Sequence, residues 1–257
     1  HHMMSPFVVG MIVFACTIAG ALIGSLLRRT WSRHHITEES RDTVEMAVGL
    51  IATITALVLG LVTASAKSSF DAVDTSVKEI ATDILTLDRL LARYGPETKE
   101  IRVALRQAVA DRIDTTWPQE SSRPARVSDP LETASGVEGL AEAIRRLAPR
   151  DDAQRSLRSR ALELAERLLK TRWLVFTAGG PSVPVAFLVV IVFWLTISFT
   201  SYGLIAPRNA TVLVLLLVCA LSVGSVIFLI LELGEPFEGM LKVSGDAFSY
   251  AHAHLNQ

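Results

Sequence analysis

The sequence has few cysteines, almost no net charge and none of the common catalytic motifs. Its two cysteines, Cys16 and Cys219, each lie in an apolar run, so neither a disulfide framework nor a zinc site is indicated. The formal net charge of −1 provides no long-range field for nucleic acid, which argues against nucleic acid as a partner. GxSxG, HExxH, CxxC and glycine-rich phosphate loops are absent. We therefore expect neither an enzyme nor a bound cofactor.

Charge is also nearly missing from four long apolar runs, although 20% of all residues are charged. Each run is long enough to cross about 30 Å of hydrocarbon as a helix. The first lacks a small-residue cleavage site, so we interpret it as a true span and not a signal peptide. The four predicted spans are residues 7–27, 46–66, 183–206 and 210–233.

Four spans place both termini on the same side of a bilayer. Only Pro207, Arg208 and Asn209 separate the third and fourth spans, so we expect these two to form a tight antiparallel hairpin. At the other end of the chain, His1, His2 and Met3 resemble a tag and cloning remnant and are excluded from fold reasoning.

The region between the second and third spans lacks strand-like alternation and has helical periodicity. Apolar residues recur at spacings of three and four, which predicts a helix packed against another helix. The members of this seam are Val73, Val77, Ile80, Ile84, Leu87 and Leu91. A second helix is expected from Pro96 to about Thr116, then an exposed loop at 119–129, a short helix around 139–147, and a last helix opening at Asp151.

Proline is absent from residues 43–94, and the only glycines there are Gly49 and Gly60, both within the second span. The simplest interpretation is one helix of about 75 Å that continues from the membrane into water. The predicted fold is therefore all-α: an integral membrane protein with four transmembrane helices and a helical soluble domain inserted between the second and third. The predicted segments are 1–4, 5–66, 67–178, 179–233 and 234–257, the last an amphipathic tail on the membrane surface or on the helical bundle.

Small and hydroxylated residues follow one side of the second span and end at a lysine. Gly49, Thr53, Ala56, Gly60, Thr63 and Lys67 recur at spacings of three and four. This pattern is typical of close helix packing in lipid, and it also fits the wall of a pore with a cationic mouth. Lys67 has a simpler alternative, because a lysine at a span end reaches toward the lipid headgroups.

Two further features have more than one interpretation. Gly20 and Gly24 in the first span form a small-xxx-small pattern that favours helix contact. At the end of the fourth span, Glu232, Glu235 and Glu238 could gather on one helical side and bind a cation such as calcium, or they could form a solvated helix end. Pro236 interrupts this stretch and favours the solvated end.

Four motifs resemble those of the bacterial bestrophin-like membrane family. They are GLIATITALVLGLVTASAKSSFD at 49–71, LDRLLARYGPETKE at 87–100, GLIAPRNATVLVLLLVCALS at 203–222 and LELGEPFEGMLKVS at 231–244. The resemblance implies a pentameric anion channel with four spans per subunit, whose second span lines an apolar neck. Leu57 and Leu61 stand where that neck commonly has aromatic residues. The pore-lining residues implied together by the face and the resemblance are Gly49, Thr53, Ala56, Leu57, Gly60, Leu61, Thr63 and Lys67.

The sequence thus predicts a homo-oligomeric channel for inorganic ions in a bacterial inner membrane. The rival hypothesis is a non-conducting scaffold or sensor whose helical domain binds a partner. Arginines in the two short loops, at 28, 29, 33, 41 and 208, favour a cytoplasmic position for these loops and an extracytoplasmic one for the helical domain. Bestrophins have the reverse arrangement, and Lys67, Arg167, Lys170 and Arg172 beside the helical domain favour that reverse.

Overall fold

The computed structural model describes residues 5–30, 38–117, 139–178, 184–207, 209–237 and 240–255, and within these ranges all regular structure is helical. The loop predicted at 119–129 lies outside them. The chain divides into two compact units. The first unit comprises residues 1–69 and 181–235, and the second comprises residues 70–180 and 236–257.

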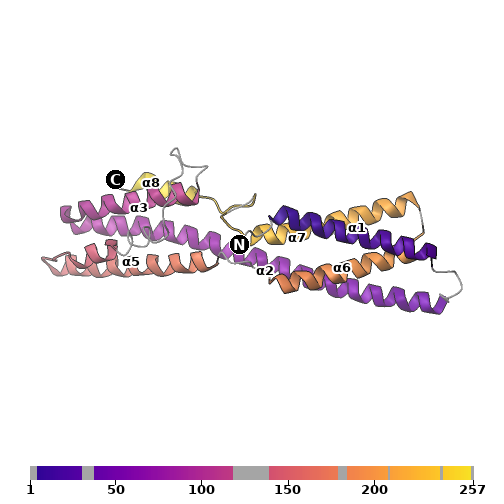
Figure 1. Ribbon diagram of the computed structural model, residues 1–257. Coiled ribbons are helices and arrows are strands. Elements are labelled where there is room, and N and C mark those ends of the chain that lie inside the picture. Colours follow the sequence, from indigo (N-terminus) through magenta and orange to yellow (C-terminus); the bar gives the residue numbers. More distant parts are fainter. Residues whose placement is uncertain are drawn as a thin grey trace. The chain divides into compact units, whose positions relative to one another are not determined.

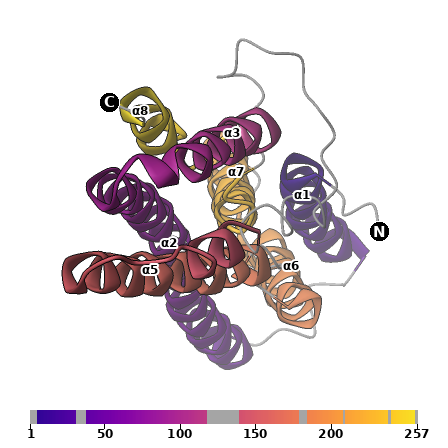
Figure 2. The same ribbon diagram turned by 90° about the vertical axis from the view of Figure 1, so that its left-hand side faces the viewer.

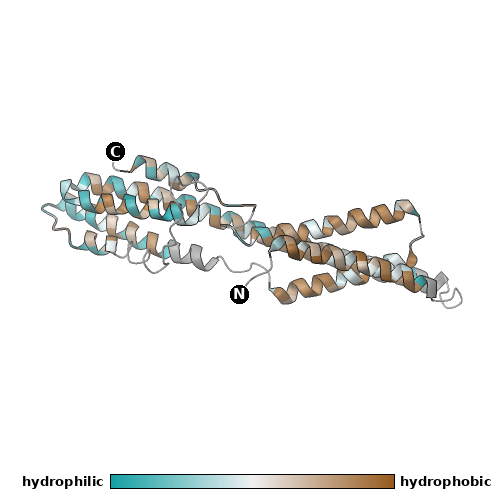
Figure 3. Cartoon of the chain, turned by 45° about the horizontal axis from the view of Figure 1, so that its top comes forward, coloured by the Kyte–Doolittle hydropathy of each residue, from teal (hydrophilic) through white to brown (hydrophobic). Residues whose placement is uncertain are grey.

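Four helices have the length and composition to cross a membrane: α1 (Pro6–Thr30), α2 (Glu38–Tyr94), α6 (Val185–Ile205) and α7 (Ala210–Leu233). They correspond to the four predicted spans. In Figure 3 the helices of the first unit are coloured mostly as hydrophobic on the side in view, as expected of helices in lipid. The prediction of four membrane-length helices is confirmed.

In the first unit, α1 packs against both α6 and α7 (Figure 1). A Cβ added at Gly24 would collide with the carbonyl oxygen of Thr200, and one at Gly203 with that of Ala21. Small residues at this crossing let the two backbones touch, so the predicted contact role of the first-span glycines is confirmed. Each of α6 and α7 contacts α1 within this unit. The tight hairpin expected of these two helices stays a prediction.

α2 is a single helix of 57 residues, as its lack of proline predicted, and it begins five residues before Thr43. It ends at Tyr94 and is followed by Gly95, whose φ of 140° only glycine adopts without strain. The Thr98 hydroxyl lies within hydrogen-bonding distance of the carbonyl oxygens of Leu91 (2.6 Å) and Gly95 (2.8 Å), and its one hydrogen serves acceptors left open at the helix end. A 3₁₀ turn, η1 (Pro96–Thr98), leads into α3 (Lys99–Thr116).

The second unit buries one apolar core, to which α3, α5 (Asp152–Ala178), α8 (Asp246–His254), a helical stretch at 139–145 and the later part of α2 contribute (Figure 2). The predicted seam of α2 is buried except for Ile80, which is half-buried while Ala81 is buried instead. From α3, Val109 also lies in this core. The shift of one residue in α2 arises because the helical period does not divide evenly into threes and fours.

The C-terminal segment was expected to lie either on the membrane surface or on the helical bundle. Its apolar residues contribute to the core of the bundle. Phe248 and Leu255 are buried in the bundle, whereas Met240 and Leu241 are exposed. The Trp117 indole at the end of α3 donates to the carbonyl oxygen of Val243 at 2.8 Å. The same ring packs against Phe248, with centroids 5.4 Å apart.

Candidate functional site: the exposed face of the second span

The spanning part of α2 is the least covered of the four spans. Only 11% of its most apolar 18-residue stretch is buried, whereas the corresponding share is 28% in α1 and 22% in each of α6 and α7. One side of α2 does pack within the unit, because Val58 and Leu59 contact a core formed by Val13, Ile191, Leu195 and Ile227. Val48, Thr55 and Ala66 are buried on the same side.

The residues predicted to line a pore lie mostly outside this contact. Gly49, Thr53, Ala56, Gly60 and Lys67 are exposed, and Thr63 is half-buried. Leu57 and Leu61 are 73% and 71% exposed. The structure therefore places these residues along one broad exposed side of α2, which we call the open face.

The glycines of the open face differ from those of α1. A Cβ added at Gly49 or at Gly60 would meet nothing within 4 Å. These two glycines therefore do not serve close packing within the described part of a single chain. They can face lipid, a second copy of the chain or an aqueous pore.

The threonine hydroxyls of this helix bond to their own backbone. Thr53 donates to the carbonyl oxygen of Gly49 at 2.8 Å, and Thr63 to that of Leu59 at 2.7 Å. Because a hydroxyl has a single hydrogen, these groups present only oxygen lone pairs to whatever lies against the open face. Lys67 is the exposed cation that ends the open face.

In the second unit, a buried acidic side chain is paired with an arginine. Asp88 of α2 is 1% exposed and accepts two hydrogen bonds from Arg102 of α3, from Nε at 2.7 Å and from Nη2 at 2.9 Å. The hydrogen bond to Asp88 raises the pKa of Arg102 above its ordinary value, so the guanidinium stays charged. This bidentate geometry fixes the α2–α3 contact.

A weaker contact joins α2 to α5. Asp83 lies 3.8 Å from Nη1 of Arg167. Burial raises the pKa of the Asp83 carboxyl above its ordinary 3.8, while Arg167 lowers it and Glu79 raises it further.

The chain matches the Bestrophin-like domain over residues 15–248. The chain belongs to the Bestrophin-like family. The family resemblance drawn from the four sequence motifs is thereby confirmed.

Solved structures with the bestrophin fold agree with this assignment. One crystal structure of a bacterial bestrophin homologue from Klebsiella pneumoniae, carrying a point mutation, has a TM-score of 0.61 over 94% of this chain and 98% of that one, at 14% identity. A second, with a different mutation, has a TM-score of 0.56 over 94% and 96%, also at 14% identity. At this identity the likeness concerns the fold alone. A comparison with curated protein sequences gave no match.

The glutamates proposed for a cation in this Bestrophin-like chain are only partly described. Glu232 is 3% exposed at the end of α7, Glu235 is half-buried, and Glu238 lies outside the described residues. Within the described ranges, no three His, Cys, Asp or Glu side chains gather as metal ligands would. The three-glutamate site stays a prediction.

Sequence reasoning missed two polar contacts of this Bestrophin-like chain, Asp88 with Arg102 and Trp117 with Val243. The first had a signal, since Asp88 adjoins Leu87 in an apolar seam where an unpaired acid would be costly. The second had none, because 126 residues separate its partners.

Proposed function

We propose that the protein is a homo-oligomeric ion channel of the bacterial inner membrane, in which the second spans of several subunits surround the pore. The observation that carries this proposal is the open face. A span that leaves its small residues uncovered in the single chain needs another surface against it, and copies of the same helix around an axis supply one. The family resemblance favours five copies.

In this arrangement Gly49, Thr53, Ala56, Gly60 and Thr63 leave room for a hydrated ion. Leu57 and Leu61 lie on the same exposed side and form an apolar constriction that can close by dewetting. The distance along the helix from Gly49 to Lys67 is about 27 Å, close to the thickness of the hydrocarbon. The pore wall therefore runs the depth of the membrane.

We further propose that the channel prefers anions. The threonine hydroxyl hydrogens are engaged by the helix backbone, so a ring of Lys67 side chains provides the attraction at the mouth. Lys67 is exposed at the end of the apolar stretch. The bound ions are inorganic anions, and no cofactor or catalytic step enters this function.

The proposal also assigns residues 67–178 to a soluble helical domain inserted between the second and third spans, and it places this domain outside the cytoplasm. The arginines of the two short loops support that side through the positive-inside rule. Bestrophins have the opposite arrangement, which makes the orientation a separate test.

Lys67→Glu tests the proposal directly. Purified protein in liposomes should conduct chloride, and the variant should lower the chloride-to-potassium permeability ratio by about tenfold, equivalent to about 1.4 kcal/mol. Lys99→Glu makes the same charge change at the start of α3 and should leave the ratio unchanged.

Two results would count against the channel. Wild-type liposomes without ion flux under any voltage or pH, together with monomers or dimers in mild detergent, would favour the scaffold or sensor. An oligomer that conducts with the same selectivity after Lys67→Glu would retain the channel but remove Lys67 from the selective mouth. Images of the particle along the membrane normal would give the number of subunits.

A further inference from the structure

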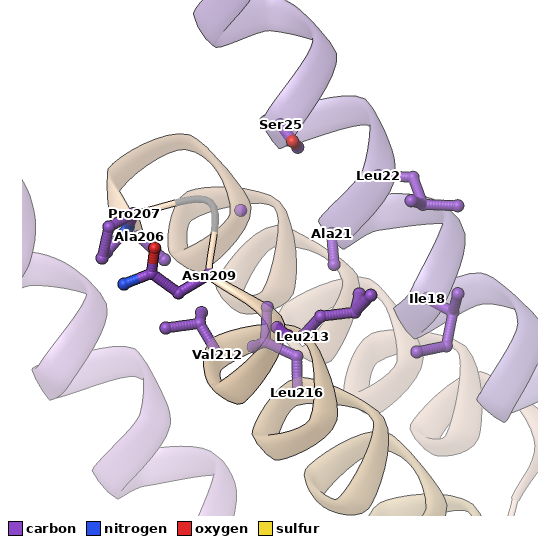
Figure 4. Close-up of a pocket in the computed structure, with 12 residues that line it drawn as sticks. Ile18, Ala21, Leu22, Ser25, Ala206, Pro207, Asn209, Val212, Leu213 and Leu216 are labelled. Atoms are coloured by element: carbon purple, nitrogen blue, oxygen red, sulfur yellow. The ribbon is translucent and has the colours of Figure 1, made fainter.

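A groove in the first unit lies between α1 and the start of α7, beside the α6–α7 turn (Figure 4). Its volume is about 330 Å³, within the roughly 300–1,000 Å³ of ligand pockets. Leu22 and Leu213 on its walls are 53% and 54% exposed, so the groove opens to the outside of the unit.

The groove is polar at one end and apolar along its length. Its polar side chains are Ser25, near the end of α1, and Asn209, just before α7. Ile18 and Leu216 line it seven residues further along their helices, which is about 10 Å deeper into the spans. The groove therefore runs from the membrane interface into the hydrocarbon.

The positively charged side chain of Arg28 lies at the interfacial end of the groove. Arg28 donates from Nη1 to the carbonyl oxygens of Ile205, at 3.4 Å, and of Ala206. Ala206 is itself a lining residue. Both bonds use the same nitrogen. The described residues offer no other acceptor to Arg28, so its Nε and Nη2 are able to bind a phosphate.

We propose that this groove binds an anionic phospholipid, with one acyl chain along the apolar walls and the phosphate beside Arg28. An acyl chain matches the walls because it is as apolar as a leucine side chain, and filling the groove restores the dispersion contacts that an empty one lacks. The fixed positive charge at the rim selects a lipid of net negative charge over a zwitterionic one. This site is separate from the open face of α2 and does not depend on ion conduction.

The experiment is a lipid titration of the purified full chain, followed by native mass spectrometry. The probes are phosphatidylglycerol and phosphatidylcholine with the same acyl chains. We expect one tightly held phosphatidylglycerol per chain and at least tenfold weaker binding of phosphatidylcholine. Ala210→Phe puts an aromatic ring into the groove and should weaken phosphatidylglycerol at least tenfold. Ala186→Phe, the same change at the exposed far end of α6, should not.

Charge is tested at Arg28. Arg28→Gln keeps a donor for the carbonyl oxygens and should abolish the preference for phosphatidylglycerol, whereas Arg28→Lys should retain most of it. Leu22→Trp fills the groove from the α1 side and replaces Ala210→Phe if that variant does not fold.

Three results would overturn the proposal. The first is equal binding of the two lipids to the wild type. The second is undiminished binding after both groove-filling changes. The third is efficient cross-linking of Leu213→Cys between copies by a short reagent in a bilayer, which would mean that a second subunit covers the groove.

Discussion

Glycine has two opposite uses in the membrane part of this chain. Gly24 and Gly203 lie where a Cβ would strike a neighbouring carbonyl oxygen, while Gly49 and Gly60 have nothing within 4 Å. The first pair sets the α1–α6 crossing. The second pair leaves α2 with a face that the single chain does not use.

Gly203→Ala and Gly60→Ala should therefore differ sharply. We expect Gly203→Ala to destabilise the protein by about 1–3 kcal/mol, because the added methyl overpacks the crossing. Gly60→Ala should change stability by less than about 0.5 kcal/mol. Thermal unfolding of both variants in detergent, followed by size-exclusion chromatography, measures the difference. Equal destabilisation by the two changes would show that the open face is packed.

Asp83 gives a pH-dependent prediction. Burial raises the pKa of its carboxyl above 3.8, so the folded state favours the protonated form. Its contribution to stability is fully present below the unfolded pKa and is lost as pH rises through the folded pKa. We expect Asp83→Asn to raise the thermal midpoint at pH 7, where the carboxylate is charged. The gain should vanish at about pH 3, and a gain independent of pH would contradict the assignment.

At the scale of elements, composition and period were enough to predict the spans, the length of α2 and most of the core. Four runs with almost no charge and the lack of proline in 43–94 are strong, local signals. What the small residues of the spanning part of α2 face could not be predicted from the sequence. Small residues are equally suited to a helix crossing, a pore wall or a contact with a neighbouring copy. Only the three-dimensional structure shows that Gly24 lies at a crossing and that Gly49 does not.

The C-terminal segment was ambiguous for a related reason. Its apolar residues suit a membrane surface or a bundle, and a contact 126 residues away decides between them. Trp117 holds this segment through one hydrogen bond and through rings that pack against Phe237 and Phe248.

Trp117→Phe should loosen the segment without unfolding the bundle. The ring contacts largely remain, but the carbonyl oxygen of Val243 loses its partner, at a cost of about 1–3 kcal/mol. We expect limited proteolysis within 236–255 to become at least about fivefold faster. Trp194→Phe, in α6 of the first unit, is the matched control. Unchanged cleavage in Trp117→Phe would mean that other contacts hold the segment.

At the scale of the whole molecule, the family and the four spans establish a membrane protein, while its orientation depends on a few cations. The arginines of the two short loops favour one orientation. Basic residues near the membrane end of residues 67–178, such as Arg167 and Lys170, favour the opposite one. Short loops weigh most in the positive-inside rule because long domains are translocated largely regardless of charge. The arginines of the short loops therefore favour the proposed extracytoplasmic position of the helical domain.

Reporter fusions decide the orientation. An even number of spans puts the C-terminus on the same side as residues 67–178, so alkaline phosphatase fused after Gln257 should be active and a green fluorescent protein there should stay dark. The same reporters inserted at 31–37 should give the reverse pair of signals. Fluorescence at the C-terminus would mean that the cations beside the helical domain outweigh the loop arginines, and it would place the Lys67 mouth on the cytoplasmic side, where it would meet intracellular anions first.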